Sequence, residues 1–556
     1  MTRGLLILLV LGIHPWPTSG QPLCPPGSAT ATLEASNVRG RLLNNGRLFW
    51  DGQDNLYEVP AGGGVQSIFL TSLAVAGLVN GELRVAASTY GPPEFWPGPL
   101  DDLGRPTRDC SGYDRIWSIR RDDLERFERT GVADRDLASW PTGLGAPTLG
   151  PTGQLLDLSR QPFDQRVARL IDLEAGERPA LVGEQLHWWI MNDAAGEHLS
   201  TGSPSIGIEI AVSAFGFDVP GVLGNSTFYQ VSLRVPGPAL EDAYFGAFFD
   251  PEIGYSNDDY AGSDSLRSLA YAYNQTDRDG SSGPGRYPGI PPATGLDFLT
   301  TPPLDASAAQ RCGRPAGMTT VVSAYFTDAS VLGRPAMAVD FSRSLQGRWR
   351  DGQHMTLGGN GRDFSNRPVC FIYSGRPPEF WSAVDERRYT GDGIWDGDRW
   401  LVAGSGPFRI GAQPEVFLLG LITSFGTDHV DSVHRLLDDS DFVQRLFDED
   451  GLLFPSARTQ EVYSPALLGA EVFPNPSAGL VRVRTESDGE ISWSADVYDL
   501  LGRLARPFSW VGGSETRTLD LSELPEGVYF LRIQGGRAVR SEKLVLLRGA
   551  NPTFVR

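Results

Sequence analysis

Short apolar stretches, bounded by Gly, Pro, Asn and Asp, recur along most of the chain, and several of them alternate with polar residues. Such stretches are typical of strands. They lie at 67–78, 82–87, 185–191, 206–217, 226–235, 319–326, 368–373, 401–403 and 416–424. Two segments have helical spacing instead: a short one at 122–130 and a long one at 428–448, where apolar residues recur from Val430 to Phe447. The pattern predicts a mostly β fold with one late helix.

The chain is too long for one ordinary domain, since it has 556 residues. Its 66 glycines and 41 prolines favour a loop-rich β architecture over helical bundles. We therefore expect multi-domain β-sandwich-like modules. The predicted division is an N-terminal β module at 21–140, a Pro/Gly-rich linker at 141–180, a central β module with acidic loops at 181–301, a third β module ending in the helix at 302–451, and a second linker at 452–470.

The last part of the chain combines several short motifs in order. A proline-rich turn, VFPNPSAG at 472–479, is followed by strand-like stretches at 480–485, 495–500, 518–521, 527–533 and 542–547. Together with VYDLLGR, LDLSELPEGVYFLRI and EKLVLLR, this turn resembles the type A C-terminal sorting domain of the type IX secretion system of Bacteroidota. The resemblance implies that residues 471–556 form an Ig-like sandwich, an export address read by the type IX secretion machinery.

The body of the chain, from about residue 37 to 448, resembles the long extracellular bodies that precede this tail in many Bacteroidota proteins. The resemblance rests on strings such as LVGEQLHWWIMND and FFDPEIGYSNDDYAGSD. It implies a surface protein and no particular activity.

The start of the chain predicts a signal peptide at 1–20. Arg3 precedes an apolar run at 5–13, and small residues at 18–20 offer a cleavage site before Gln21. The apolar run is too short to span a bilayer, and no later stretch predicts a transmembrane helix. With the tail, these features predict Sec export and an extracellular or outer-membrane surface location.

The net charge and the spacing of the cysteines exclude several classes of function. The formal net charge of −20 argues against nucleic acid as a partner, because no basic cluster is present to contact phosphates. The cysteines are far apart and form no metal-binding or thioredoxin-like motif. In an oxidising compartment they can form two disulfides with three alternative pairings, of which we favour Cys24–Cys110 and Cys312–Cys370.

Acidic residues crowd into three loops. The first group is Asp250, Glu252, Asn257, Asp258, Asp259 and Asp264; the second is Asn274, Asp277 and Asp279; the third is Asp392, Asp396 and Asp398. Crowded carboxylates repel one another, and Ca²⁺, which takes six to eight oxygen ligands, removes that repulsion. None of the loops has the full EF-hand pattern. We expect Ca²⁺ as a cofactor of the first two groups, with solvated acidic loops as the alternative.

Catalytic motifs are absent from the sequence: it has no GxSxG elbow, Walker loop or HExxH zinc motif. Aromatic pairs such as Trp188-Trp189 and Phe380-Trp381 either fill a core or stack on sugar rings. The sequence therefore favours a non-catalytic structural, adhesive or ligand-binding surface protein, stabilised by calcium, with a surface glycan as a partner. A secreted hydrolase acting on polysaccharide or peptide is the alternative.

Overall fold

The structure is a computed structural model. It describes residues 24–280, 283–304, 316–325, 329–383, 397–450, 469–474, 477–486, 491–498, 504–512, 515–525, 527–535 and 538–546. The predicted signal peptide, most of the second linker, Cys312, Asp392 and Asp396 lie outside these ranges. No helix in the described ranges is long and apolar enough to cross a membrane.

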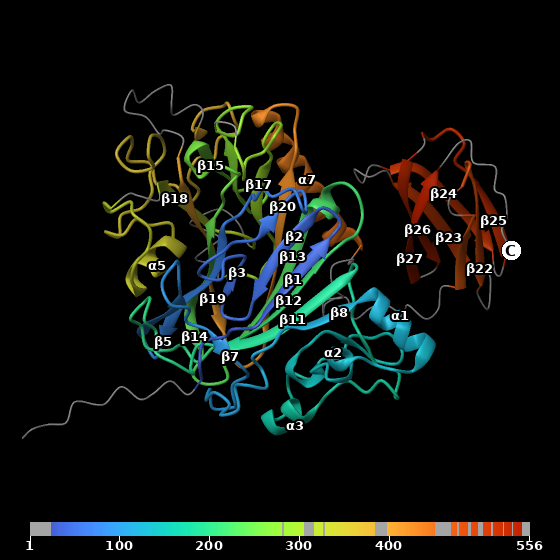
Figure 1. Cartoon of the computed structure of the whole chain (residues 1–556), viewed down its shortest axis with the longest axis horizontal. Coiled ribbons are helices and arrows are strands. Elements are labelled where there is room, and N and C mark those ends of the chain that lie inside the picture. The colour runs from blue at the N-terminus through green and yellow to red at the C-terminus, as the bar shows by residue number, and fades with distance from the viewer. Residues whose placement is uncertain are drawn as a thin grey trace, which may run out of the picture.

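Two large antiparallel sheets form the body (Figure 1). The described part of the first, sheet I, has nine strands. Their order is β1 (Thr30–Ala35), β2 (Val38–Leu43), β3 (Arg47–Leu48), β5 (Leu70–Val79), β14 (Leu240–Asp250), β19 (Arg399–Ile410) and β18 (Thr320–Tyr325), with β4 (Tyr57–Glu58) beside β2 and β6 (Glu82–Ala87) beside β5. Strand β14 is central: its Phe248 is paired with Ser72 on one side and Val402 on the other.

Sheet II also has nine strands among the described residues. Their order is β15 (Asp259–Asp264), β16 (Leu269–Asn274), β17 (Ala293–Thr300), β20 (Glu415–Ser424), β13 (Ser226–Arg234), β12 (Glu209–Gly216), β11 (Gln185–Asn192) and β7 (Trp96–Pro97), with β8 (Trp117–Arg120) beside β11. Strand β20 joins its two halves, because it pairs with β13 on one side and with β17 on the other.

The order of the strands corrects the expected division into three modules. The ranges 21–140, 181–301 and 302–451 each contribute strands to both sheets. The late strand β19 pairs with β14, and β14 pairs with the early strand β5. Local turn signals carry no information on which distant strand each strand joins.

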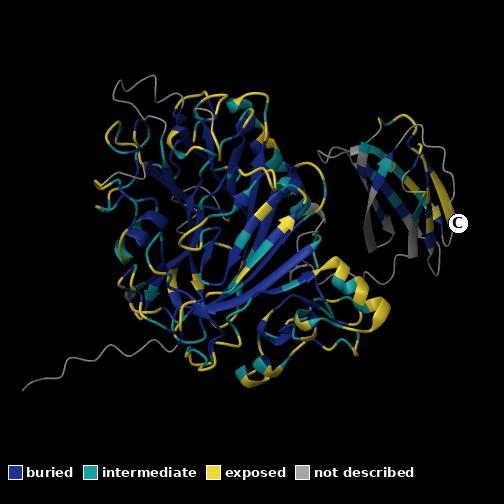
Figure 2. Ribbon diagram, viewed as in Figure 1, coloured by how far each residue is buried: buried dark blue, intermediate teal, exposed yellow. Residues whose placement is uncertain are grey.

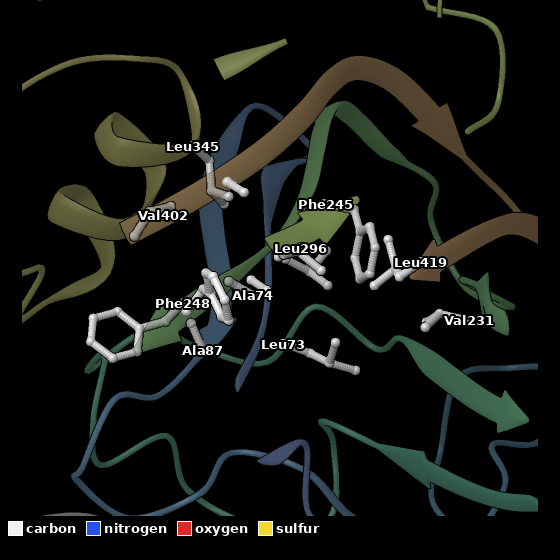
Figure 3. Close-up of a cluster of buried hydrophobic side chains, with 14 of the residues drawn as sticks. Leu73, Ala74, Ala87, Val231, Phe245, Phe248, Leu296, Leu345, Val402 and Leu419 are labelled. Carbon is white, nitrogen blue, oxygen red and sulfur yellow. The ribbon is translucent and has the colours of Figure 1, made fainter. Parts of the chain in front are cut away.

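The space between the two sheets is filled by one apolar core (Figures 2 and 3). Phe245 of β14 is buried there, and its ring centroid lies 4.3 Å from that of Phe417 of β20. Leu73 of sheet I and Leu296 and Leu419 of sheet II belong to the same core. The sandwich is therefore held by side chains from both sheets, and the mostly β prediction is confirmed.

Helices cover the outer faces of the sandwich. On sheet I, α5 (Ala338–Leu345) packs against β5, β6 and β19. On sheet II, α7 (His429–Asp450) packs against β16, β17 and β20 (Figure 1). Its Val433, Leu436 and Leu437 are buried in a second apolar core, as the helical spacing predicted. The short helix α1 (Arg121–Thr130), also predicted, follows β8.

The segment 141–180 is packed structure, which corrects its prediction as a linker. It contains the short helix α3 (Phe163–Ala168) and the strand pair β9 (Thr148–Leu149) and β10 (Arg178–Pro179). Leu144 and Ile171 are buried in the second core with Trp188 of sheet II. Its Pro and Gly content correctly indicated irregular backbone. The segment is nevertheless packed on sheet II, because its apolar side chains are buried there.

Two other expectations about strands are corrected. Residues 368–373 form isolated bridges rather than a strand. The acidic stretch 259–264, expected as a loop, is strand β15 at one edge of sheet II.

A disulfide joins Cys24 to Cys110, with a Cα–Cα distance of 5.9 Å, which confirms the first favoured pairing. Cys370 is also disulfide-bonded, and the partner favoured for it, Cys312, lies outside the described residues.

The C-terminal tail has a separate apolar core between two small antiparallel sheets. One sheet contains β21 (Gly469–Phe473), β22 (Leu480–Glu486) and β25 (Glu515–Asp520); the other contains β24 (Leu504–Gly512), β23 (Ile491–Tyr498), β26 (Gly527–Gly535) and β27 (Ala538–Leu546). Val481, Trp493 and Leu531 are buried between them. The expected small sandwich is therefore present in the tail.

The contact between the two sheets gives a first prediction. Phe245→Ala leaves a cavity in the shared core and should lower the free energy of unfolding by about 3–5 kcal/mol. Phe380→Ala, which removes a ring that is 55% exposed, should change it by less than about 0.5 kcal/mol. Urea unfolding followed by tryptophan fluorescence measures both. Equal effects of the two substitutions would contradict the packing described.

Candidate metal centre

Strands β15 and β16 bring acidic and amide side chains together at one edge of sheet II. In their antiparallel register Asp259 lies directly opposite Asn274. Asp258 immediately precedes β15, and Asp279 lies in the loop that follows β16. All four side chains are buried. We call Asp258, Asp259, Asn274 and Asp279 acidic site 1.

Backbone N–H groups hold all three carboxylates in place, and the one that donates to Asp259 is that of Ile253, at 3.1 Å. Asp279 accepts hydrogen bonds from the backbone of Tyr255 at 2.8 Å and of Tyr287 at 2.6 Å. Asp258 accepts one from the backbone of Gly280 at 2.6 Å. Gly254, at φ +68°, allows Asp279 to lie close, since a Cβ on it would meet the carboxylate at 1.7 Å. The local backbone is therefore folded around these carboxylates.

Two buried oxygens of acidic site 1 have no hydrogen-bond partner: Asp259 Oδ1 and Asn274 Oδ1. The orientation of the Asn274 amide is fixed because its Nδ2 donates to the carbonyls of Thr276, at 3.0 Å, and Arg278, at 2.8 Å. Its oxygen consequently faces away from those carbonyls. Buried acceptors left without a donor are costly, and oxygen atoms of this kind are the ligands that Ca²⁺ prefers.

The charge of acidic site 1 is unbalanced. Burial raises the pKa of Asp259 well above its ordinary value, and the carboxylates of Asp258 and Asp279 raise it further. Burial also raises the pKa of Asp279, against its backbone hydrogen bonds and the nearby guanidinium of Arg286. Three carboxylates and one guanidinium leave an excess of two negative charges when all are ionised, which equals the charge of one Ca²⁺.

A second group, acidic site 2, consists of the buried Asp250 and the partly buried Glu252 and Asp398. Asp250 ends β14, and Asp398 directly precedes its neighbour β19, so the first and third acidic loops of the sequence meet here. The hydroxyl of Tyr90 donates to Asp250 Oδ2, and Gln66 Nε2 donates to Glu252 at 2.9 Å. The buried Oδ1 atoms of Asp250 and Asp398 have no hydrogen-bond partner.

Aromatic rings and an arginine border acidic site 2. The Tyr90 ring lies 5.5 Å from that of Trp50 and 5.8 Å from that of Phe248. The guanidinium of Arg334 lies 5.1 Å from the Tyr90 ring centroid. Burial, and then the charge of Asp398, raises the pKa of Glu252 to about 7. Burial raises the pKa of Asp398 to about 6, against the charge of Arg334.

The other predicted metal ligands lie elsewhere. Asn257 is exposed. Asp264 pairs with Arg267, at 2.7 Å, and Arg267 also pairs with Asp441 of α7, so Asp264 belongs to an ion-pair network. Asp277 pairs with His429 at 2.7 Å on the surface.

Possible metal ligands lie closer together in one surface group than in acidic site 1. Among the described residues, Asp277, Asp428 and His429 form the one group of three whose ligand atoms all lie within 4.8 Å of one another. Their carboxylates already accept hydrogen bonds from the first turn of α7 and its preceding residues. The carboxylates of acidic site 1 do not converge as closely, so a cation there would have to draw them together.

Most of the predicted aromatic sites are core. Trp96, Trp188, Trp189, Trp381 and Trp400 are buried. Glu94, which precedes the first Phe-Trp pair, is also buried and accepts hydrogen bonds from the backbone of Ala87, Ser200 and Thr201. Tyr90 and Gln66 carry no sequence signal that separates them from other polar loop residues, and the fold alone shows their role.

The family model for a secretion system C-terminal sorting domain matches residues 471–547. The chain carries a type IX secretion sorting tail. The type IX sorting tail agrees with the resemblance seen in the sequence and with the two-sheet structure of this segment. It means export to the cell surface or the extracellular space by the type IX secretion machinery. A comparison with curated proteins found no match.

The raised pKa values predict an unusual pH dependence of stability in EDTA. Glu252 binds its proton more tightly when folded, so the stability it contributes is present below about pH 4.5 and is lost as the pH rises through about 7. A shift of this size is worth up to about 3 kcal/mol. The melting temperature of the type IX cargo should therefore fall between pH 4.5 and 7.5.

Glu252→Gln should flatten that fall, because an amide cannot ionise. Glu82→Gln, at a side chain that is 73% exposed, should leave the fall unchanged. A melting temperature that rises with pH over this range, or is flat in the unsubstituted protein, would contradict the description of acidic site 2.

Proposed function

We propose that this protein is a calcium-stabilised, non-catalytic ligand-binding protein of the cell surface or extracellular space. The observation that carries the proposal is acidic site 1, with its two partnerless buried oxygens and its excess of negative charge. A divalent cation coordinated there supplies the partner that the oxygens lack and offsets the repulsion between the carboxylates.

Calcium in this position stabilises the edge of the sandwich. Its ligands come from β15, from β16 and from the loop that ends at Asp279, so binding ties these three segments together. The sorting tail supports the proposal, because exported proteins meet an environment in which weak calcium sites are filled. Structural or adhesive display at the surface requires no catalytic residue.

Calcium should raise the melting temperature of the purified protein. At a hundredfold excess over the dissociation constant, binding to the native state adds about 2.7 kcal/mol, which for a chain of this size is a shift of a few degrees. Asp259→Asn should abolish the shift. Asp363→Asn, at a side chain that is 77% exposed, should keep it. Differential scanning calorimetry in EDTA and in excess CaCl₂ measures all three proteins.

An unchanged melting temperature on adding calcium would end the calcium proposal. A shift that survives in Asp259→Asn but disappears in Asp277→Asn would move the cation to the surface group of Asp277, Asp428 and His429.

A secreted hydrolase is the second candidate, and acidic site 2 is the observation that favours it. The carboxyl groups of Glu252, two residues after β14, and of Asp398, directly before β19, interact beside aromatic rings. Their pKa values of about 7 and about 6 suit an acid and a base working near neutral pH. In this scheme Glu252 in its protonated form donates to a leaving group, and Asp398 in its ionised form accepts a proton from water.

Hydrolysis is tested by incubating the protein with polysaccharides and with casein, and assaying new reducing ends and new amines. Activity lost in both Glu252→Gln and Asp398→Asn, with a bell-shaped pH profile, would support the hydrolase. Product formation that persists in both variants, or none from the unsubstituted protein, would reject it and leave the non-catalytic reading.

A further inference from the structure

An open pocket of about 380 Å³ lies beside acidic site 1. Its walls come from three segments distant in sequence, which contribute Asn55, Glu58 and Gln66, then Tyr255, and finally Arg286. This volume is in the range that accepts a small ligand of one or two sugar units. Of the apolar residues in its wall, Tyr57 and Val65 are buried, whereas Leu56 is partly exposed and Tyr255 and Pro284 are exposed beside the polar side chains.

Hydrogen bonds connect the wall of the pocket to both acidic sites. Asp279 of acidic site 1 holds the backbone N–H of Tyr255 and of Tyr287, the residue after Arg286. Gln66 donates its side chain to Glu252 of acidic site 2, and its carbonyl accepts from the backbone of Gly254. The positions of the wall residues therefore depend on the positions of buried carboxylates.

Arg286 is a charged residue of the pocket wall that forms no ion pair within 4.0 Å with any described carboxylate. Its guanidinium stacks on the Tyr255 ring, with 4.1 Å between its central carbon and the ring centroid. Its Nη1 atom is buried, so it does not face the pocket, and the guanidinium charge acts on nearby Asp279. The other guanidinium nitrogens, Nε and Nη2, are left as N–H donors for a carboxylate in the pocket.

The rest of the wall suits hydroxyl groups. The amides of Asn55 and Gln66 bond to each other and keep further donor and acceptor capacity. Glu58 is an acceptor, and the glycines at positions 64, 254 and 285 expose backbone. Sugar rings carry hydroxyls in all directions, and these polar groups can donate to them and accept from them.

We propose that this pocket binds a saccharide bearing a carboxylate, such as a uronic acid, with Arg286 pairing the carboxylate. The proposal rests on the calcium function in one respect: the three carboxylates of acidic site 1 repel an anion next to them, and a bound cation offsets that repulsion. Calcium also fixes Asp279, and through it the backbone that carries Tyr255 and Arg286. Binding of the saccharide is therefore calcium-dependent.

Isothermal titration of the full chain with a disaccharide of galacturonic acid tests the proposal, with the neutral galactose disaccharide as the ligand control. The uronic acid should bind in calcium at least about tenfold more tightly than the neutral sugar and more tightly than in EDTA. Arg286→Gln should weaken binding by about tenfold or more, because it removes the charged donor. Arg278→Gln, at an exposed arginine of the neighbouring loop, should bind like the unsubstituted protein.

The calcium-induced rise in melting temperature separates the two proposals. Arg286→Gln should keep that rise while losing the saccharide. No binding of the uronic acid, equal binding of the neutral sugar, or full binding by Arg286→Gln would overturn the inference even if the rise is observed. Binding that is equal in calcium and in EDTA would overturn the calcium dependence, and an absent rise would reject the calcium function separately.

Discussion

The packing of two antiparallel sheets around one apolar core is the constraint on which the body of this protein depends. Strand β14 has neighbours on both sides in sheet I and faces β20 of sheet II through Phe245 and Phe417. Once these strands are fixed, their ends are fixed as well. Asp250 ends β14, Asp398 precedes β19 and Asp259 begins β15, so the sandwich decides where the carboxylates lie. The acidic sites are consequences of the fold rather than independent loops.

Burial gives these carboxylates their chemical character. On the surface of a protein with a net charge of −20, acidic loops are usually solvated and screened. Here the carboxyl groups of Asp250, Asp259 and Asp279 are removed from water, and their pKa values rise. A proton or a cation must then compensate the charge. The two sites differ in the groups available for this compensation. Acidic site 1 has a buried amide oxygen, which suits a cation, whereas acidic site 2 has a tyrosine hydroxyl and a nearby arginine.

Local features of the fold could be predicted from the sequence, and long-range ones could not. The apolar spacing of α7 is encoded within a few residues, as are the motifs of the sorting tail. The pairing of β5 with β14, and of β14 with β19, depends on contacts between residues far apart, which a periodic pattern does not specify. For the same reason the sequence grouped Asp264 with Asp259, although Asp264 pairs with Arg267, and it did not connect Asp398 with Asp250. The residue types in the sequence indicated carboxylate chemistry, and the sheet topology determines which carboxylates lie together in one site.

The central claim is that a cation lies between Asp259 and Asn274, and a crystal structure of the protein grown in calcium tests it most directly. The account predicts an anomalous scattering peak within about 2.3–2.6 Å of Asp259 Oδ1 and Asn274 Oδ1, with the carboxylate of Asp258 turned toward it. A well-ordered water molecule, or a protein N–H group, in that position with no anomalous signal would contradict the claim.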